Sequence, residues 1–151
     1  MSVEIKEVTN NKELKQFVKF NLELYKGNPY HVPGLISEEM MTLDRKRNPA
    51  FEVCDAIYFL AYKNGKIAGR IAGIINRPSN EVWKQKRARF GFVDFIDDEE
   101  VVDALFAAVE KWAKEKGMTE MHGPLGFTDM DHEGMLVEGF DQLGTMATIY
   151  N

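Results

Sequence analysis

The chain lacks most of the features that mark a secreted or membrane protein. Cys54 is the single cysteine among 151 residues, so no internal disulfide can form, which fits a reducing compartment. No apolar run approaches the ~20 residues that span a bilayer. The first residues, MSVEIKEVTNNKELK, contain no apolar signal core. We therefore expect a cytoplasmic protein with no membrane partner.

The chain also lacks an excess of positive charge. The chain carries 19 basic and 24 acidic residues, a formal net charge of -5 at pH 7. Because affinity for nucleic acids depends on neutralising phosphates, we expect no nucleic-acid partner. A local basic cluster remains, which is either a solvated surface or a phosphate contact: Lys84, Lys86, Arg87 and Arg89.

The composition is otherwise that of one globular domain. Hydrophobic residues make up 44% of the chain and charged residues 28%, close to the average for folded proteins. A chain of this length buries roughly 70% of the surface that its unfolded form exposes. Its core therefore needs no disulfide or metal ion for stability.

The first part of the chain shows one strand pattern and two helix patterns. Residues 3–8 alternate apolar and charged side chains, which predicts a half-buried strand. Apolar side chains then recur at helical spacing up to Tyr25, after a cap at Asn10 or Asn11. A second helix follows a proline-rich loop, and we expect Ser37 to cap it.

A β-hairpin is predicted in the middle of the chain. Asn64-Gly65 lies between two apolar, β-branched segments, and both residues accept the positive φ of a tight turn. Gly69 and Gly73 then lie on one face of the returning strand. Glycines in a strand indicate the close approach of a helix or of a ligand, and we favour tight packing of a helix.

The second half of the chain alternates further helices and strands. We expect a short helix, a strand, a long helix, a short strand and a final strand at residues 80–87, 89–96, 98–116, 118–122 and 145–150. A capping box, with Asp97 as the cap and Glu100 three residues later, is expected to start the long helix. Residues 133–138 predict one or two helical turns. This order of elements indicates an α/β (α+β) fold with a mixed sheet flanked by helices.

Asp94 is a candidate general base, because it lies among aromatic residues on a predicted strand. Burial raises the pKa of a carboxyl group and makes it a better acceptor for the proton of an amine. The structural alternative is an ion pair with Arg89 or Arg70. The residues alone leave both interpretations open.

Acidic residues and histidines also gather at residues 129–133, with His122 nearby. Carboxylates and imidazoles bind divalent ions, but this spacing matches no established metal motif. A capped helix start accounts for these residues better, so we predict no metal site. Cys54 has no recognisable histidine partner and is expected to be structural.

Several segments resemble the acyl-CoA N-acyltransferases of the GNAT superfamily. Residues 63–71 (KNGKIAGRI) resemble the hairpin of these enzymes. Residues 89–95 (RFGFVDF), 122–124 (HGP) and 134–140 (GMLVEGF) resemble the N-terminal half of longer bacterial GNAT-like proteins. The resemblance implies a mixed, mostly antiparallel sheet flanked by helices. It also implies one GNAT-like domain over residues 1–151, incomplete without a further helix and one or two strands.

The resemblance implies a reaction and a cleft. In GNAT enzymes an amine directly attacks the thioester of acetyl-CoA or another acyl-CoA, so this chain is expected to acylate a small-molecule amine. The cleft would open between the strand that ends at Phe95 and the strand that ends at His122. Asp94 or His122 is the implied base, and Tyr150 is the implied proton donor to the departing thiolate.

The resemblance also assigns residues around the acyl-CoA. Backbone contacts to this cosubstrate are implied for Val93, Phe95, Ile96 and Asp98. His31 lies in a proline-rich loop that resembles a lid on the substrate side, where nothing fixes its role.

The turn after residues 89–96 departs from the GNAT pattern. In the family it is a Gln/Arg-x-x-Gly-x-Gly/Ala loop whose backbone N–H groups, with a helix N-terminus, hold the pyrophosphate of coenzyme A. Here it is Asp97-Asp98-Glu99-Glu100, with no glycine. Four carboxylates suit a helix N-terminus but repel a pyrophosphate. A second hypothesis is therefore a non-catalytic GNAT-like module that packs on another domain or subunit, as a homodimer or against a C-terminal domain.

Overall fold

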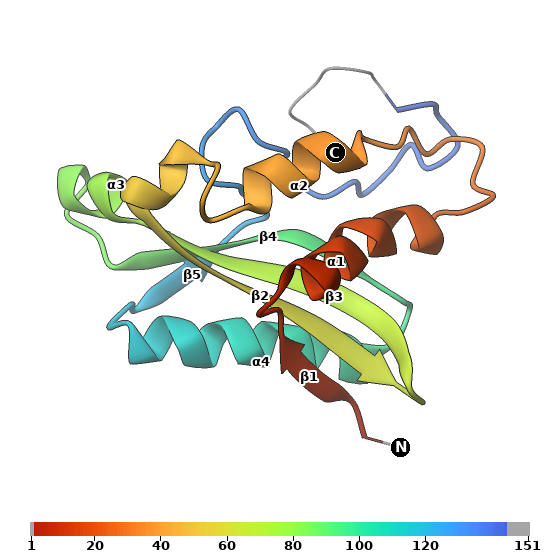
Figure 1. Cartoon of the computed structure of the whole chain (residues 1–151), viewed down its shortest axis with the longest axis horizontal. Coiled ribbons are helices and arrows are strands. Elements are labelled where there is room, and N and C mark those ends of the chain that lie inside the picture. The colour runs from red at the N-terminus through yellow and green to blue at the C-terminus, as the bar shows by residue number, and fades with distance from the viewer. Residues whose placement is uncertain (1, 145–151) are drawn as a thin grey trace.

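The computed structural model describes residues 2–144, which fold around a five-stranded sheet (Figure 1). Its strands, in sheet order and chain order alike, are β1 (Glu4–Glu7), β2 (Cys54–Lys63), β3 (Lys66–Asn76), β4 (Arg87–Phe95) and β5 (Glu120–His122). Neighbouring strands are antiparallel except β4 and β5, which run parallel because a helix connects them. The expected mixed, mostly antiparallel sheet is confirmed.

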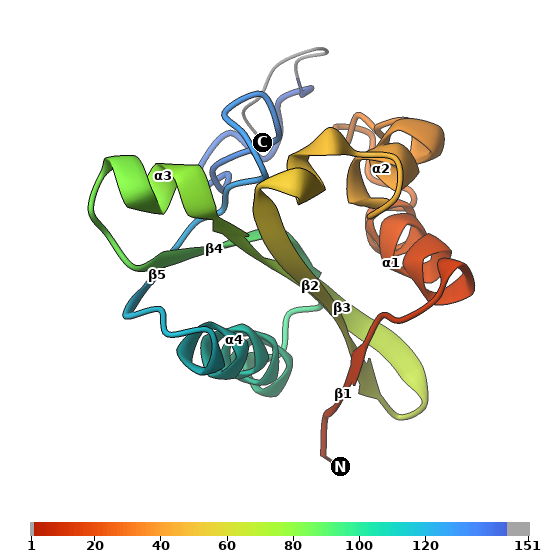
Figure 2. The same ribbon diagram turned by 60° about the vertical axis from the view of Figure 1, so that its left-hand side comes forward.

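Helices cover both faces of the sheet. α1 (Asn11–Leu24) and α2 (Ile36–Leu43) lie on one face and α4 (Glu99–Glu115) lies on the other, as Figure 2 shows. A short 3-10 helix (Pro49–Glu52) and α3 (Arg77–Val82) lie beside the connections at one end of β2 and β3. In the described part of the chain, no helix is long and apolar enough to cross a bilayer.

The core beneath α1 and α2 contains large apolar side chains with almost no solvent exposure: Phe17, Val18, Leu43, Leu60, Ile74 and Phe127. Fully burying one side chain of this kind contributes about 1.5–3 kcal/mol, so this core holds α1 on the sheet. The side chain of Asn10 accepts a hydrogen bond from the N–H of Glu13 at 2.9 Å, which confirms the predicted cap.

Two glycines of β3 let α4 lie directly on the sheet. A Cβ atom at Gly69 would lie 2.7 Å from Leu105 Cδ1, and one at Gly73 would lie 3.0 Å from the ring of Trp112. Both contacts are tighter than side chains tolerate without moving. The predicted helix packing over these glycines is therefore confirmed.

The β-hairpin is confirmed, and the helix after it starts earlier than predicted. Asn64 and Gly65 adopt φ values of +54° and +74°, as the tight turn requires. We predicted a helix over residues 80–87, but α3 begins at Arg77. The reason is the Asn76 side chain, which caps the helix by accepting the N–H three residues later at 3.0 Å.

Two predicted helix caps are wrong by one or two residues. α2 begins at Ile36, so Ser37 lies inside its first turn, and the cap position, Leu35, makes no side-chain hydrogen bond. Ile36 packs on the core beneath α1, so apolar packing rather than a polar cap sets this start. At α4 the cap is Asp98 instead of Asp97, because its carboxylate accepts the N–H two residues later at 3.0 Å.

The segment after β5 contains no helix at residues 133–138. Gly134 and Gly139 adopt φ values of +79° and +86°, and this left-handed conformation interrupts a right-handed helix. The final strand predicted at residues 145–150, and with it Tyr150, lies outside the described residues.

Candidate functional site

β4 is irregular in its middle. Phe92 adopts a φ of +47°, and the register between β3 and β4 shifts between Arg70 and Ala72, which marks a β-bulge. A positive φ is uncommon for an aromatic residue and costs of order 1–3 kcal/mol. Such strained positions cluster at functional sites, so the bulge indicates that the residues after Phe92 belong to a candidate site.

The edge of β4 that faces β5 opens at this bulge. The paired residues of the two strands end at Arg89 and His122. One further backbone hydrogen bond follows, from the N–H of Leu125 to the carbonyl oxygen of Phe90 at 2.9 Å. Within residues 2–144, no other backbone group pairs with this edge further along β4.

The open edge offers backbone donors from two of the residues that we expected to contact acyl-CoA. The N–H of Ile96 donates to Ala68 O at 2.9 Å, toward β3. Because N–H groups alternate along a strand, those of Val93 and Phe95 face the open edge. The sheet therefore uses the N–H of Ile96 and leaves those of Val93 and Phe95 as donors, and the four expected contacts to acyl-CoA stay predictions.

Asp94 lies between these two donors and is held by three hydrogen bonds. Arg70 Nε donates to Asp94 Oδ2 at 2.8 Å, Asn21 Nδ2 donates to the same oxygen at 3.1 Å, and the Tyr25 hydroxyl donates to Oδ1 at 3.0 Å. Only 11% of the Asp94 side chain is exposed. Of the alternatives left open by the sequence, the ion pair with Arg70 is present.

Arg70 joins this carboxylate to the two helices above the sheet. Its Nη1 donates to Glu39 Oε1 of α2 at 2.7 Å and to the carbonyl oxygen of Phe17 in α1 at 3.1 Å. Its guanidinium also lies 5.1 Å from the centroid of the Phe17 ring. A buried cation between two carboxylates is well compensated, so Arg70, Glu39 and Asp94 form a rigid polar centre under α1 and α2.

Tyr25 connects the polar centre to His31. Burial, followed by the charge of Asp94, raises the pKa of Tyr25 to about 12, so its hydroxyl stays protonated and donates. The His31 ring stacks on the Tyr25 ring, with centroids 4.7 Å apart and planes at 30°. His31 Nε2 is buried and has no hydrogen-bond partner in the described chain. Burial lowers the pKa of His31, against an opposing effect of Asp94.

His122 lies apart from this polar centre. It ends β5 opposite Arg89, five positions before Asp94 along β4, and a strand rises ~3.3 Å per residue. The two predicted bases are therefore not brought together. Burial, followed by the nearby guanidinium groups of Arg87 and Arg89, lowers the pKa of His122.

The acidic start of α4 is partly neutralised by the hairpin. Lys63 forms a very short ion pair with Asp98 and lies 3.2 Å from a carboxylate oxygen of Glu100. The hydrogen bond from Lys63 is the main reason that the pKa of Asp98 is lowered. Asp97 and Glu99 form no ion pair within residues 2–144, so two of the four carboxylates keep an uncompensated charge.

Two of the four cations in the basic cluster have structural partners. Arg87 Nε donates to Glu120 Oε2 at 2.8 Å, and Arg89 Nη1 donates to the carbonyl oxygens of Gly126 and Phe127, each at 3.2 Å. Among the described residues, no group of three histidine, cysteine or acidic side chains is placed to bind a metal ion. Asp131 instead accepts the N–H of Phe127 at 2.8 Å.

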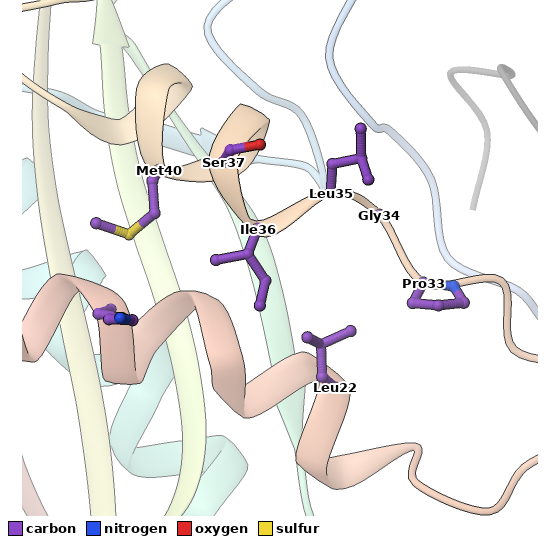
Figure 3. Close-up of a pocket in the computed structure, with 8 residues that line it drawn as sticks. Leu22, Pro33, Gly34, Leu35, Ile36, Ser37 and Met40 are labelled. Atoms are coloured by element: carbon purple, nitrogen blue, oxygen red, sulfur yellow. The ribbon is translucent and has the colours of Figure 1, made fainter.

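An apolar groove of about 730 Å³ runs between α1 and α2. Its lining comes from α1, from the loop before α2 and from α2 itself: Lys15, Leu22, Pro33, Gly34, Leu35, Ile36, Ser37 and Met40. Figure 3 shows the side chains of Ile36 and Met40 directed toward α1. Pro33 lines the groove and lies two residues after His31 in the chain, so the groove adjoins the loop that carries this histidine.

The polar centre contains residues that sequence reasoning missed. Asn21 of α1 and Tyr25, the residue directly after this helix, both reach Asp94, but the sequence pattern assigned Tyr25 to an apolar stripe. Glu39 had no visible partner, because it meets Arg70 only after α2 packs on α1. A polar pair four residues apart on the buried side of α1 was the one available signal.

No protein-family model matches the chain. Two curated proteins resemble it in sequence. Protein YghO of Escherichia coli (strain K12) is 36% identical over 132 residues, which are 87% of this chain and 34% of that protein. A bacterial ceramide synthase of Caulobacter vibrioides is 32% identical over 130 residues, 85% of this chain and 34% of that protein. The chain spans about a third of the length of these relatives.

Solved structures of GNAT proteins share the architecture. A tandem GNAT protein from the clavulanic acid biosynthesis pathway matches 81% of this chain and 36% of its own with a TM-score of 0.62 at 13% identity. A GNAT-family acetyltransferase of Staphylococcus aureus matches 82% of this chain and 74% of its own with a TM-score of 0.57 at 15% identity. The PaiA N-acetyltransferase of Thermoplasma acidophilum, in complex with coenzyme A, matches 82% of this chain and 79% of its own with a TM-score of 0.53 at 16% identity. The chain therefore has the fold of the GNAT, or acyl-CoA N-acyltransferase, superfamily.

Proposed function

We propose that this chain transfers an acyl group from an acyl-CoA to an amine. The observation that carries the proposal is the open edge of β4 after the bulge at Phe92, beside a buried polar centre, in a chain with the GNAT fold. A solved relative in fold binds coenzyme A. An amine that attacks the thioester directly needs no covalent intermediate on the protein.

Val93 and Phe95 would hold the cosubstrate. Their N–H groups on the open edge can donate to the amide carbonyls of acyl-CoA, in the way a neighbouring strand would use them. The start of α4 contributes a dipole that favours the pyrophosphate, and the charges of Asp97 and Glu99 oppose it. The residues present thus fit the pantetheine arm better than the pyrophosphate.

We further propose a long-chain amine as the acceptor. One relative is a ceramide synthase, and a ceramide is a long-chain amine whose nitrogen carries a fatty acyl group. The apolar groove between α1 and α2 provides a surface for an alkyl chain, with Lys15 and Ser37 as its polar members. The groove adjoins the loop of His31, so an amine with its tail in the groove would have its head group near the polar centre.

Thiol release from acetyl-CoA and palmitoyl-CoA tests both parts of the proposal, with ethanolamine or a long-chain 2-amino-1,3-diol as acceptor. We expect turnover with the long-chain amine. Leu35→Asp places a charge in the groove, which opposes binding of an alkyl chain. It should raise KM for that amine roughly tenfold, which corresponds to about 1.4 kcal/mol of binding free energy. Val137→Asp is the matched control, since Val137 is at least as exposed and does not line the groove. The absence of thiol release with every acceptor contradicts the proposal.

A second candidate is a non-catalytic GNAT-like module that packs on another domain or subunit. Besides the uncompensated acids at α4, residues 130–143 expose apolar side chains, as an interface does: Met130, Met135, Leu136, Val137, Phe140 and Leu143. This candidate predicts no acyl-CoA binding in isothermal titration and self-association in light scattering. A monodisperse monomer that turns over acyl-CoA refutes it.

A further inference from the structure

His31 has a buried ring nitrogen that forms no hydrogen bond with the described residues. The chain contains three histidines, and His31 Nε2 is buried with no hydrogen-bond partner in residues 2–144. A buried polar atom without a partner costs about 1–3 kcal/mol. Such atoms are rare in native folds, and a catalytic role is one of the established reasons for keeping them.

The position of His31 connects it to the open edge of β4. Its ring stacks on Tyr25, and the Tyr25 hydroxyl donates to Asp94. Asp94 lies between Val93 and Phe95, whose N–H groups face that edge. A single side chain therefore separates the unpartnered nitrogen from the strand that the proposed function assigns to acyl-CoA.

The two bases expected from the sequence are less suitable. The Asp94 carboxylate already accepts three hydrogen bonds, one of them from a guanidinium, so both of its oxygens are engaged within the protein. Asp94 is therefore placed to support Tyr25 and Arg70 rather than to contact a substrate. His122 of β5 pairs with Arg89, which lies five positions before Asp94 along β4, and it lies beside the cations Arg87 and Arg89.

We infer that His31 Nε2 is the general base of the proposed acyl transfer, an inference that rests on the proposed function. As the amine nitrogen forms its bond to the thioester carbonyl carbon, its proton passes to His31 Nε2. The carbon–sulfur bond breaks, and coenzyme A leaves as a thiolate that takes a proton from solvent. His31 then returns its proton to solvent, so the products are an amide and a free thiol.

The groups around His31 favour the protonation state that a base requires. Tyr25, at the C-terminal end of α1, and Asp94 of β4 face it, and Arg70 of β3 and Glu39 of α2 lie behind Asp94. Burial lowers the pKa of His31 more than Asp94 raises it. The imidazole is therefore neutral at pH 7 and able to accept a proton.

Three single variants test the inference: His31→Gln, His122→Gln and His132→Gln, the last at an exposed histidine as the matched control. Removing a general base lowers the reaction rate by a factor of about 10²–10⁴. We expect His31→Gln to lower kcat by at least 100-fold with little change in KM for acyl-CoA, and to abolish the acid limb of the pH profile. In a fourth variant, His31→Ala, added imidazole should partly restore the rate. The His132→Gln variant should match the wild type.

NMR titration of the imidazole protons gives a readout that needs no turnover. The resonance lost in His31→Gln should titrate below 6.5, the ordinary histidine value, at the midpoint of the acid limb. A kcat that falls less than 100-fold in His31→Gln, or an acid limb that persists in this variant, overturns the base assignment alone, as does an acid limb lost in His122→Gln. A wild-type protein without turnover on any acyl-CoA overturns the base assignment and the proposed function together.

Discussion

Asp94 and Arg70 form an ion pair that is almost entirely buried, with 11% and 5% of their side chains exposed. Removing one partner of such a pair leaves a charge without compensation and costs about 3–5 kcal/mol. We expect Asp94→Ala to lower the free energy of unfolding by about 3 kcal/mol, because Glu39 still pairs with Arg70. Urea unfolding, followed by circular dichroism, measures the loss.

The exposed pair of Arg77 and Asp55 provides the matched control. Their atoms are as close as those of the buried pair, at 2.8 Å, but 49% and 42% of the side chains are exposed. Solvent screens such pairs, so Asp55→Ala should cost less than about 1 kcal/mol. Equal losses in the two variants would contradict a buried polar centre held by Asp94.

At the scale of elements, Gly91 fixes the path of the chain after β5. A Cβ atom at Gly91 would overlap the carbonyl oxygen of Leu125, which is backbone and cannot rotate away. Gly91→Ala should therefore displace the segment after β5 and cost about 1–3 kcal/mol, the usual range for overpacking. Gly34→Ala is the control, since no atom lies within 4 Å of its Cβ position. An unchanged urea midpoint in Gly91→Ala would show that the two segments are not in contact.

The start of α4 should weaken acyl-CoA binding through two unpaired charges. The Asp97→Asn, Glu99→Gln double variant removes both, and we expect acyl-CoA affinity to rise by up to about tenfold, or about 1.4 kcal/mol. The gain should shrink with added salt, because the screening length is ~10 Å at 0.1 M. The Glu110→Gln, Glu115→Gln double variant is the control, because it also removes two negative charges but toward the other end of α4. Isothermal titration compares the two, and equal affinities argue against a pyrophosphate at this helix start.

Elements with strong periodicity were predictable, and their ends were less so. The Asn64-Gly65 turn and the long amphipathic helix are local features, so the residues near each position were sufficient evidence. The start of α2 depends on Ile36 meeting the core, and Asp98, the cap of α4, is also paired with Lys63 across 35 positions. Both are tertiary contacts, which neighbouring residues alone do not indicate.

At the scale of the whole molecule, the polar centre explains why the candidate site was only partly predictable. α1, α2, β3 and β4 each contribute a side chain, and the hydrogen bonds span from 24 to 73 positions in the chain. Asp94 and its pairing with Arg70 were among the sequence alternatives. The unpartnered nitrogen of His31 was not, because an unsatisfied atom is defined only by the three-dimensional surroundings.

Stability of the whole fold should fall on mild acidification. Burial lowers the pKa of both His31 and His122 below the ordinary value of 6.5. Between the lowered value and 6.5 the unfolded chain binds more protons than the folded one, so stability is complete above pH 6.5 and declines as the pH falls through this window. Asp98, whose pKa is lowered from 3.8, contributes only at more acidic pH.

Urea midpoints measured from pH 8 to pH 5 should therefore fall in the wild type and in His132→Gln, and stay nearly level in the His31→Gln, His122→Gln double variant. Parallel profiles in all three proteins would mean that neither half-buried histidine couples folding to pH.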